Sequence, residues 1–219
     1  MKPLAHLLTS SFLIGFVSAC EPGAEKSTIS KVTPTEVYQV AALSKALPYD
    51  TLRLQQESFG GNSILFYLRH PQIPQVAKDL YLGHAEPSDD DKTLALMDSI
   101  FTKNTVTQPF YFLTLTRTMP KADGAYSEPL GIMAKEFVEQ HPSRFAAYFL
   151  TEKLLTKKDF GNWAERVAME FDISNEGHAA SARAAWAKAQ LNNCKSGSTA
   201  EESKLREFTE LVNGWHQPD

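Results

Sequence analysis

The apolar residues of this sequence recur three and four positions apart, which is the spacing of side chains along one face of an α-helix. Such stripes are formed by Leu94, Met97 and Phe101; by Leu130, Met133, Ala134, Phe137 and Val138; by Trp163, Val167 and Phe171; and by Leu205, Phe208, Val212 and Trp215. A β-strand places every second residue on one face, so this spacing favours helices over strands for these segments.

Capping residues and prolines divide the stripes into separate helices. We expect helices to begin near Thr33, Ser88, Ser127 and Thr199, because Ser and Thr hydroxyls cap helix N-termini. Glu202 gives the last of these starts the spacing of a capping box. Prolines interrupt the apolar pattern at Pro71, Pro74 and Pro142.

The pattern predicts eight or nine helices with short connections and no alternation of strands with helices. The expected fold class is all-α, with antiparallel helical hairpins arranged as a bundle or a short αα-superhelix. We expect residues 34–219 to form a single helical domain. Within it, residues 60–62 (Gly-Gly-Asn) form a loop and not a domain boundary, because the preceding piece is too small for its own core.

Residues 110–116 are compatible with two secondary structures. Their aromatic and β-branched composition favours a strand, whereas Thr107 and Pro109 resemble the start of a helix. A strand here would lack a partner in an otherwise helical chain, so we predict a helix.

Composition excludes several classes of protein. The chain has 219 residues, 42% of them hydrophobic, and a formal net charge of −4. This apolar content is too high for general disorder, and the chain lacks the basic character of a nucleic-acid binder, so we expect no nucleic-acid partner. Two cysteines are too few for a disulfide-dense scaffold or a four-cysteine zinc site.

The first 19 residues have the pattern of a secretory signal peptide. Lys2 precedes an apolar run from Leu7 to Val17, and small residues follow it. The run is shorter than the ~20 apolar residues that a membrane-spanning helix needs. We therefore expect residues 1–19 to be removed and the remainder to be exported.

The end of this segment, Val17-Ser18-Ala19-Cys20, resembles the lipobox of bacterial lipoproteins. The resemblance implies cleavage before Cys20, a thioether-linked diacylglycerol on its sulfur and a third acyl chain on its amine. Two or three acyl chains anchor a protein stably, whereas one does not. Residues 20–33 are small and polar and are expected to be a flexible tether between lipid and domain.

The resemblance also predicts a location. Residue 21 is Glu, whereas proteobacterial lipoproteins retained in the inner membrane carry Asp there, so we expect an outer-membrane anchor facing the periplasm. The alternative is an ordinary signal-peptidase site that leaves Cys20 as a free N-terminal thiol. That thiol could then form a disulfide with Cys194 in the oxidising periplasm.

Residues suited to catalysis or metal binding do not form a recognised motif. No serine lies in a G-x-S-x-G or S-x-x-K context, and no histidine pair has the H-E-x-x-H spacing. The histidines beyond the signal segment each lie near Pro, Gly or an expected helix end: His70, His84, His141, His178 and His216. We accordingly predict no catalytic residue, no metal site and no cofactor.

Two further features have structural explanations. Cys194 is expected to be an exposed or half-buried structural thiol, the alternative being a nucleophile paired with His178 or His216. The run Asp89-Asp90-Asp91 suits the positive N-terminal end of a helix. It does not fit an EF-hand, because Leu94 occupies the position where that loop requires glycine.

The segment 118–130 is the most unusual loop and a candidate interaction loop. Asp123-Gly124 is a turn signal, and Tyr126 follows it closely. The alternative is a tight turn between helices. Several aromatic residues at helical spacing are expected to be core residues, the alternative being a ligand groove: Phe110, Tyr111, Phe112, Tyr148 and Phe149.

These observations favour a lipid-anchored, non-enzymatic helical protein that acts through contact with another envelope protein. An immunity or inhibitor protein is one version of this function. Two alternatives come from other classes: an envelope hydrolase with a dispersed active site, and a carrier of a small apolar ligand.

Overall fold

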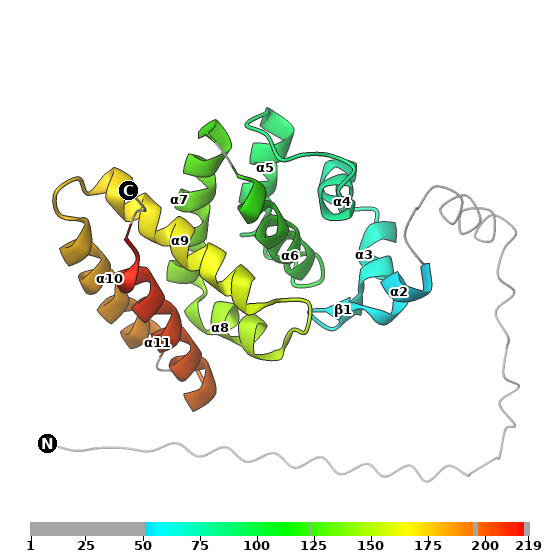
Figure 1. Cartoon of the computed structure of the whole chain (residues 1–219). Coiled ribbons are helices and arrows are strands. Elements are labelled where there is room, and N and C mark those ends of the chain that lie inside the picture. The colour runs from blue at the N-terminus through cyan, green and yellow to red at the C-terminus, as the bar shows by residue number, and fades with distance from the viewer. Residues whose placement is uncertain (1–50, 123, 195–196, 217–219) are drawn as a thin grey trace, which may run out of the picture. The chain divides into compact units, whose positions relative to one another are not determined.

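Ten α-helices make up almost all of the regular structure in the computed structural model, which describes residues 51–122, 124–194 and 197–216 (Figure 1). The all-α prediction is confirmed. The elements are α2 (Thr51–Gln56), β1 (Ser58–Phe59), β2 (Asn62–Ser63), α3 (Ile64–Arg69), α4 (Gln75–Leu82), α5 (Asp91–Ser99), α6 (Gln108–Thr118), the 3-10 turn η1 (Met119–Lys121), α7 (Gly124–Gln140), α8 (Pro142–Thr151), α9 (Lys157–Ser174), α10 (Ala179–Asn193) and α11 (Thr199–Gly214).

The number of helices is slightly higher than the eight or nine expected. Short helices account for the difference. Helix α2 has only six residues and buries only Leu54, so its sequence contains no apolar stripe that would predict it. The helix expected near Thr33 and the proposed signal and tether segments lie outside the described residues. No helix within the described residues is long and apolar enough to cross a membrane.

Helix α6 is the centre of the fold. Every residue of α6 except Arg117 is buried, and the helix packs against α4, α5 and α9. The prediction of a helix at 110–116 is confirmed. A helix enclosed by neighbours on nearly every side is stabilised by packing, which explains how aromatic and β-branched residues are accommodated here. Pro109 lies in its first turn, where no backbone bond is lost.

The predicted core aromatics form one packed cluster around Phe112. Its ring lies 4.8 Å from that of Trp163 on α9, 4.7 Å from Tyr148 on α8 and 5.2 Å from Phe137 on α7. Phe110, Tyr111, Phe112 and Tyr148 are buried, and Phe149 packs against the same core. The ring cluster therefore joins helices from both halves of the described chain.

Gly60 and Gly61 of the expected loop at residues 60–62 form the turn of a two-stranded hairpin, and Asn62 begins its second strand. Gly60 and Gly61 both have positive φ, at 56° and 84°, which favours glycine. A Cβ atom on Gly60 would lie 2.4 Å from Cβ of Pro109, so this turn also requires glycine for close packing against α6. The Gly60 amide donates to Glu152 Oε1 at 2.9 Å, which ties the hairpin to the end of α8.

Three helix starts differ from the sequence predictions. Helix α7 begins at Gly124 and not at Ser127, so Pro129 lies inside it. The N-cap of α5 is Asp90 and not Ser88, and α11 is capped by Ser198, not Thr199. Alternative caps one to three residues away satisfy the same backbone groups, and the sequence does not distinguish between them.

Candidate functional site

Two of the three residues of the predicted interaction loop, Gly124 and Tyr126, lie in the first turn of α7. Asp123 lies outside the described residues, and Gly124 is the exposed first residue of the helix. Tyr126 is only 2% exposed, and its hydroxyl lies 2.8 Å from Thr118 Oγ1. Burial raises the pKa of Tyr126. The Tyr126 side chain is therefore an interior anchor of the turn and is not presented to a partner.

Arg166 of α9 holds the same turn from the inside. Its guanidinium donates to the carbonyl oxygens of Met119 at 3.1 Å and Ala122 at 3.4 Å, and also to the hydroxyl of Ser127. Arg166 is buried. These charge-assisted hydrogen bonds tie the carbonyl groups before α7, and Ser127 in its first turns, to α9.

The histidines lie on separate elements. His70, His141 and His178 flank α3, α8 and α10, as expected for residues near helix ends. The His141 ring packs edge-on against Phe137. Burial lowers the pKa of His141, and the positive charge of Arg144 lowers it further. In the described ranges, no three His, Cys, Asp or Glu residues lie close enough to hold a metal ion.

Cys194 and the aspartate run have structural roles. Cys194 is completely buried, with its sulfur 3.5 Å from Ser143 Oγ, so the prediction of an exposed or half-buried thiol is wrong. The error arises because the polar residues around Cys194 concealed its packing against α8. Asp90 accepts hydrogen bonds from Ser88 and Thr93 that lower its pKa to about 2. These contacts identify Asp90 as a helix cap, in agreement with the structural explanation of the run.

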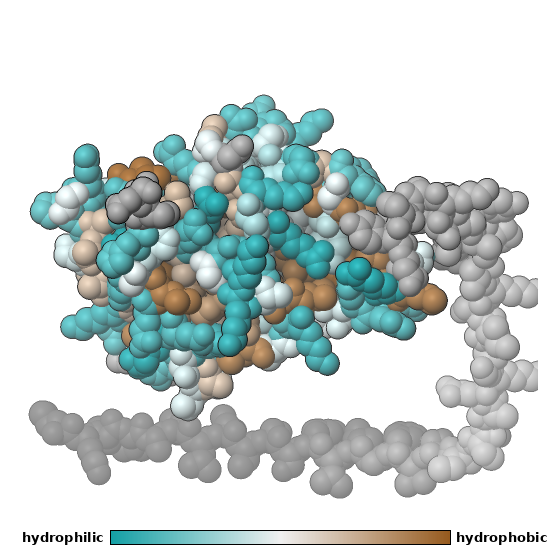
Figure 2. All heavy atoms as spheres, viewed as in Figure 1, coloured by the Kyte–Doolittle hydropathy of each residue, from teal (hydrophilic) through white to brown (hydrophobic). Residues whose placement is uncertain are grey.

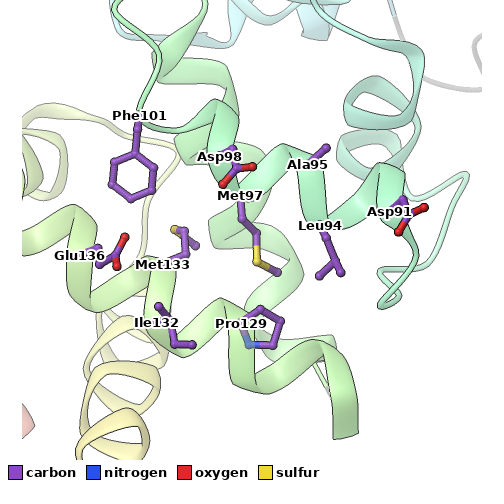
Figure 3. A pocket seen from close by; sticks show the side chains of 10 residues that line it. All are labelled: Asp91, Leu94, Ala95, Met97, Asp98, Phe101, Pro129, Ile132, Met133 and Glu136. Carbon is purple, nitrogen blue, oxygen red and sulfur yellow. The ribbon is translucent and has the colours of Figure 1, made fainter. Parts of the chain in front are cut away.

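The most distinctive surface feature is a groove of about 430 Å³ between α5 and α7 (Figure 3). Both helices run along it, and Figure 3 shows Asp91 toward one end and Glu136 toward the other. The residues that line it are Asp91, Leu94, Ala95, Met97, Asp98, Phe101, Pro129, Ile132, Met133 and Glu136. We refer to this feature as the α5–α7 groove.

The floor of the α5–α7 groove is apolar and adaptable. Met97 and Met133 are buried beneath it, and Leu94 and Phe101 are half-buried. Ile132 is 42% exposed, which makes it one of the few large apolar side chains at the surface. Methionine side chains repack easily around different shapes, so such a floor suits a protein partner better than a rigid ligand.

The rim of the groove is acidic. Asp91, Asp98 and Glu136 are exposed, and none of them has an ion-pair partner within the described chain. No lysine or arginine lines the groove. Lys135, although next to Glu136, pairs with Glu139 at 3.1 Å and lies over the ring of Phe171. The rim charge is thus not neutralised by the fold.

A second groove, of about 640 Å³, lies on the other side of α5, against α4. Its lining includes both Asp79 and Lys92, so its charge is mixed. Asp79 already accepts a hydrogen bond from Gln75 at 2.9 Å. The face visible in Figure 2 is mostly hydrophilic, with separate apolar areas. The α5–α7 groove differs from these surfaces in combining an apolar floor with charge of a single sign.

Comparisons with protein-family models, with curated proteins and with solved structures find no match to this chain. The candidate site therefore depends on its own geometry. The sequence analysis does not predict it, because the stripes at Leu94 and Met133 indicate core positions and the aspartate run is explained by the start of a helix. The available signal was Asp98, an acid close to the expected end of a helix.

Proposed function

We propose that this protein is a lipid-anchored, non-enzymatic component of the bacterial envelope that binds a partner protein through the α5–α7 groove. The lipobox resemblance at Cys20 supports the anchor and a periplasmic orientation, with Glu21 favouring the outer membrane. The helical domain displays the groove, and the tether lets it reach a partner away from the lipid surface.

The observation that carries the proposal is the exposed apolar floor beside unpaired carboxylates. Isolated apolar side chains are common on protein surfaces. A hollow that combines a partly exposed Ile132 with an apolar floor and surrounding carboxylates is more typical of an interaction site. Because the rim is open to solvent, the groove resembles a docking surface more than the enclosed cavity of an apolar-ligand carrier.

Affinity capture from detergent-solubilised envelopes tests this function. Ile132→Glu places a charge on the apolar floor, whereas Leu211→Glu makes the same change at a 45% exposed position on α11. We expect the wild-type chain and the Leu211 variant to retain the same partner and the Ile132 variant to lose it. Capture of an identical set of proteins by all three chains would contradict the proposal.

The anchor is tested separately with Cys20→Ala. This change removes the sulfur that carries the diacylglycerol, so we expect loss of acyl labelling and release of the protein from the membrane fraction. If the wild-type protein is found in the membrane fraction but carries no acyl label, the lipoprotein assignment is wrong.

A further inference from the structure

The walls of the α5–α7 groove have the spacing of two helix faces. Asp91, Leu94 and Asp98 follow one another at three and four positions along α5, and Pro129, Ile132 and Glu136 do so along α7. Seven residues of helix span about 10 Å, so the lined length corresponds to two helical turns. Side-chain ridges at this spacing fit the ridges of a third helix better than they fit an extended strand.

The negative charge of the groove favours a partner with a positively charged surface. Three carboxylates surround the apolar floor, and no basic side chain lines it. A neutral or acidic partner would bring these carboxylates into a less polar environment without compensation. A partner with lysine or arginine at the edges of its apolar face would instead place a cation against each carboxylate.

Asp98 supports this interpretation independently. It lies in the last turn of α5, where the helix macrodipole disfavours negative charge, and that turn contains no basic residue. No hydrogen bond or ion pair to its carboxylate occurs among the described residues. The macrodipole argument makes this charge unfavourable for its own helix, and such departures from local rules are expected at functional positions.

We propose that the α5–α7 groove binds a cationic amphipathic helix of a partner protein. Its apolar face packs on Met97, Met133 and Ile132, and its lysine or arginine side chains pair with Asp98 and Glu136. This inference rests on the proposed function and specifies the chemistry of the partner segment. The anionic rim also distinguishes such a helix from an anionic lipid surface, which it would repel.

Methionine-methyl NMR can test the inference on the full, lipid-anchored chain in zwitterionic nanodiscs. The probe is a synthetic helix of about 11 residues, or three turns, with leucines three and four positions apart and lysines elsewhere. We expect it to shift the methyl resonances of Met97 and Met133 in proportion to added peptide. Met119, the buried first residue of η1, and Met169 on α9 line no part of the groove and serve as internal references.

Two peptide controls separate charge from hydrophobicity. A version with glutamate in place of lysine should leave Met97 and Met133 unshifted, and a scrambled lysine version should bind at least about tenfold more weakly because its apolar face is broken. Equal binding of the glutamate peptide would overturn the inference, as would equal shifts of Met119 and Met169.

A protein variant tests the rim directly. The triple change Asp91→Asn, Asp98→Asn and Glu136→Gln keeps the side-chain shapes, and we expect it to weaken the lysine peptide by about tenfold, since exposed ion pairs contribute modestly and add together. The charge-matched control carries Glu165→Gln, Glu176→Gln and Glu210→Gln, none of which lines the groove. Equal affinity in the two triple variants would overturn the inference, with thermal melting used to verify that both are folded.

The two proposals fail in different ways. If Ile132→Glu abolishes capture of a partner whose contact segment is not basic, the proposed function stands and the cationic-helix inference is wrong. If capture is unaffected by Ile132→Glu, the proposed function itself is wrong.

Discussion

Two helix junctions differ in how fully side chains fill the space between their helices: the junction of α8, α9 and α11, and the junction of α5 and α7. In the first, the rings of Phe145 and Phe208 lie 4.5 Å apart and Phe160 lies 5.3 Å from Phe208, so aromatic side chains fill the space between the helices. In the second, Met97 and Met133 form a floor and a groove of about 430 Å³ remains above them.

The difference shows how one set of packing rules gives both a scaffold and a surface. Aromatic residues bury the largest areas and lock a junction into one arrangement. Shorter or unbranched side chains such as Ala95 and Met133 leave room and can repack. We infer that the aromatic junction contributes more to stability than the α5–α7 junction, which leaves the groove that we propose as a binding surface. Substitutions in the aromatic junction should therefore cost much more stability than substitutions in the groove.

The largest expected effect comes from the aromatic junction. Phe145→Ala should lower the free energy of unfolding by about 3–5 kcal/mol, because a fully buried ring is replaced by a cavity. The matched change in the groove, Ile132→Ala, should lower it by less than about 1 kcal/mol, since that side chain is already partly in water. Urea unfolding measures both, and equal losses would contradict the division into scaffold and surface.

The next effect concerns the turn that leads into α7. Arg166→Met keeps the aliphatic stem but removes the donors to Met119, Ala122 and Ser127, and should cost about 2–3 kcal/mol of stability. Hydrogen exchange should rise most in residues 119–127 if the arginine anchors this turn. Uniformly faster exchange over the chain would show that Arg166 has no local role.

A smaller pair of effects lies within α5 and has opposite signs. Asp98→Asn should stabilise the protein by about 0.3–1 kcal/mol at low ionic strength, because it removes a negative charge from the helix C-terminus. Asp91→Asn removes a favourable charge from the first turn and should destabilise it by a similar amount. Thermal melting in low salt compares the two, and destabilisation by Asp98→Asn would show that its charge serves the fold.

The smallest expected effect is a pH dependence at His141. Burial is the main cause that lowers the pKa of this imidazole in the folded state, and the positive charge of Arg144 adds to it. The unfolded chain therefore binds a proton at a higher pH than the folded protein, so stability should fall as pH drops below about 6.5. Replacing His141 with Asn should flatten this part of the stability curve. An unchanged slope would show that other groups control it.

The sequence predicted the fold class because apolar periodicity is a local property that tertiary packing reinforced. The helix at 110–116 followed from Pro109 and from the lack of a strand partner. Helix starts were less predictable, since Ser127 was a credible cap whereas the helix begins at Gly124. Which of two neighbouring caps is used depends on packing by residues such as Arg166, distant in the sequence.

The groove could not be predicted because it depends on how closely two helices approach. Periodicity places Met133 on the buried stripe of α7 and Ile132 outside it, as observed, but it does not say that α5 leaves a hollow above Met133. Likewise, Tyr126 follows a turn signal typical of interaction loops but is interior, because Thr118 and the enclosing helices bury it. Such distances between elements are absent from a periodic pattern.

Site-specific photo-crosslinking in intact cells shows whether a partner binds at the α5–α7 groove. A photoreactive amino acid at position 132 probes the α5–α7 groove, and one at position 211 probes an equally exposed site on α11. We expect a discrete cross-linked partner from position 132 and none from position 211. The same partner from both positions, or from position 211 alone, would contradict the assignment of the groove as the binding surface.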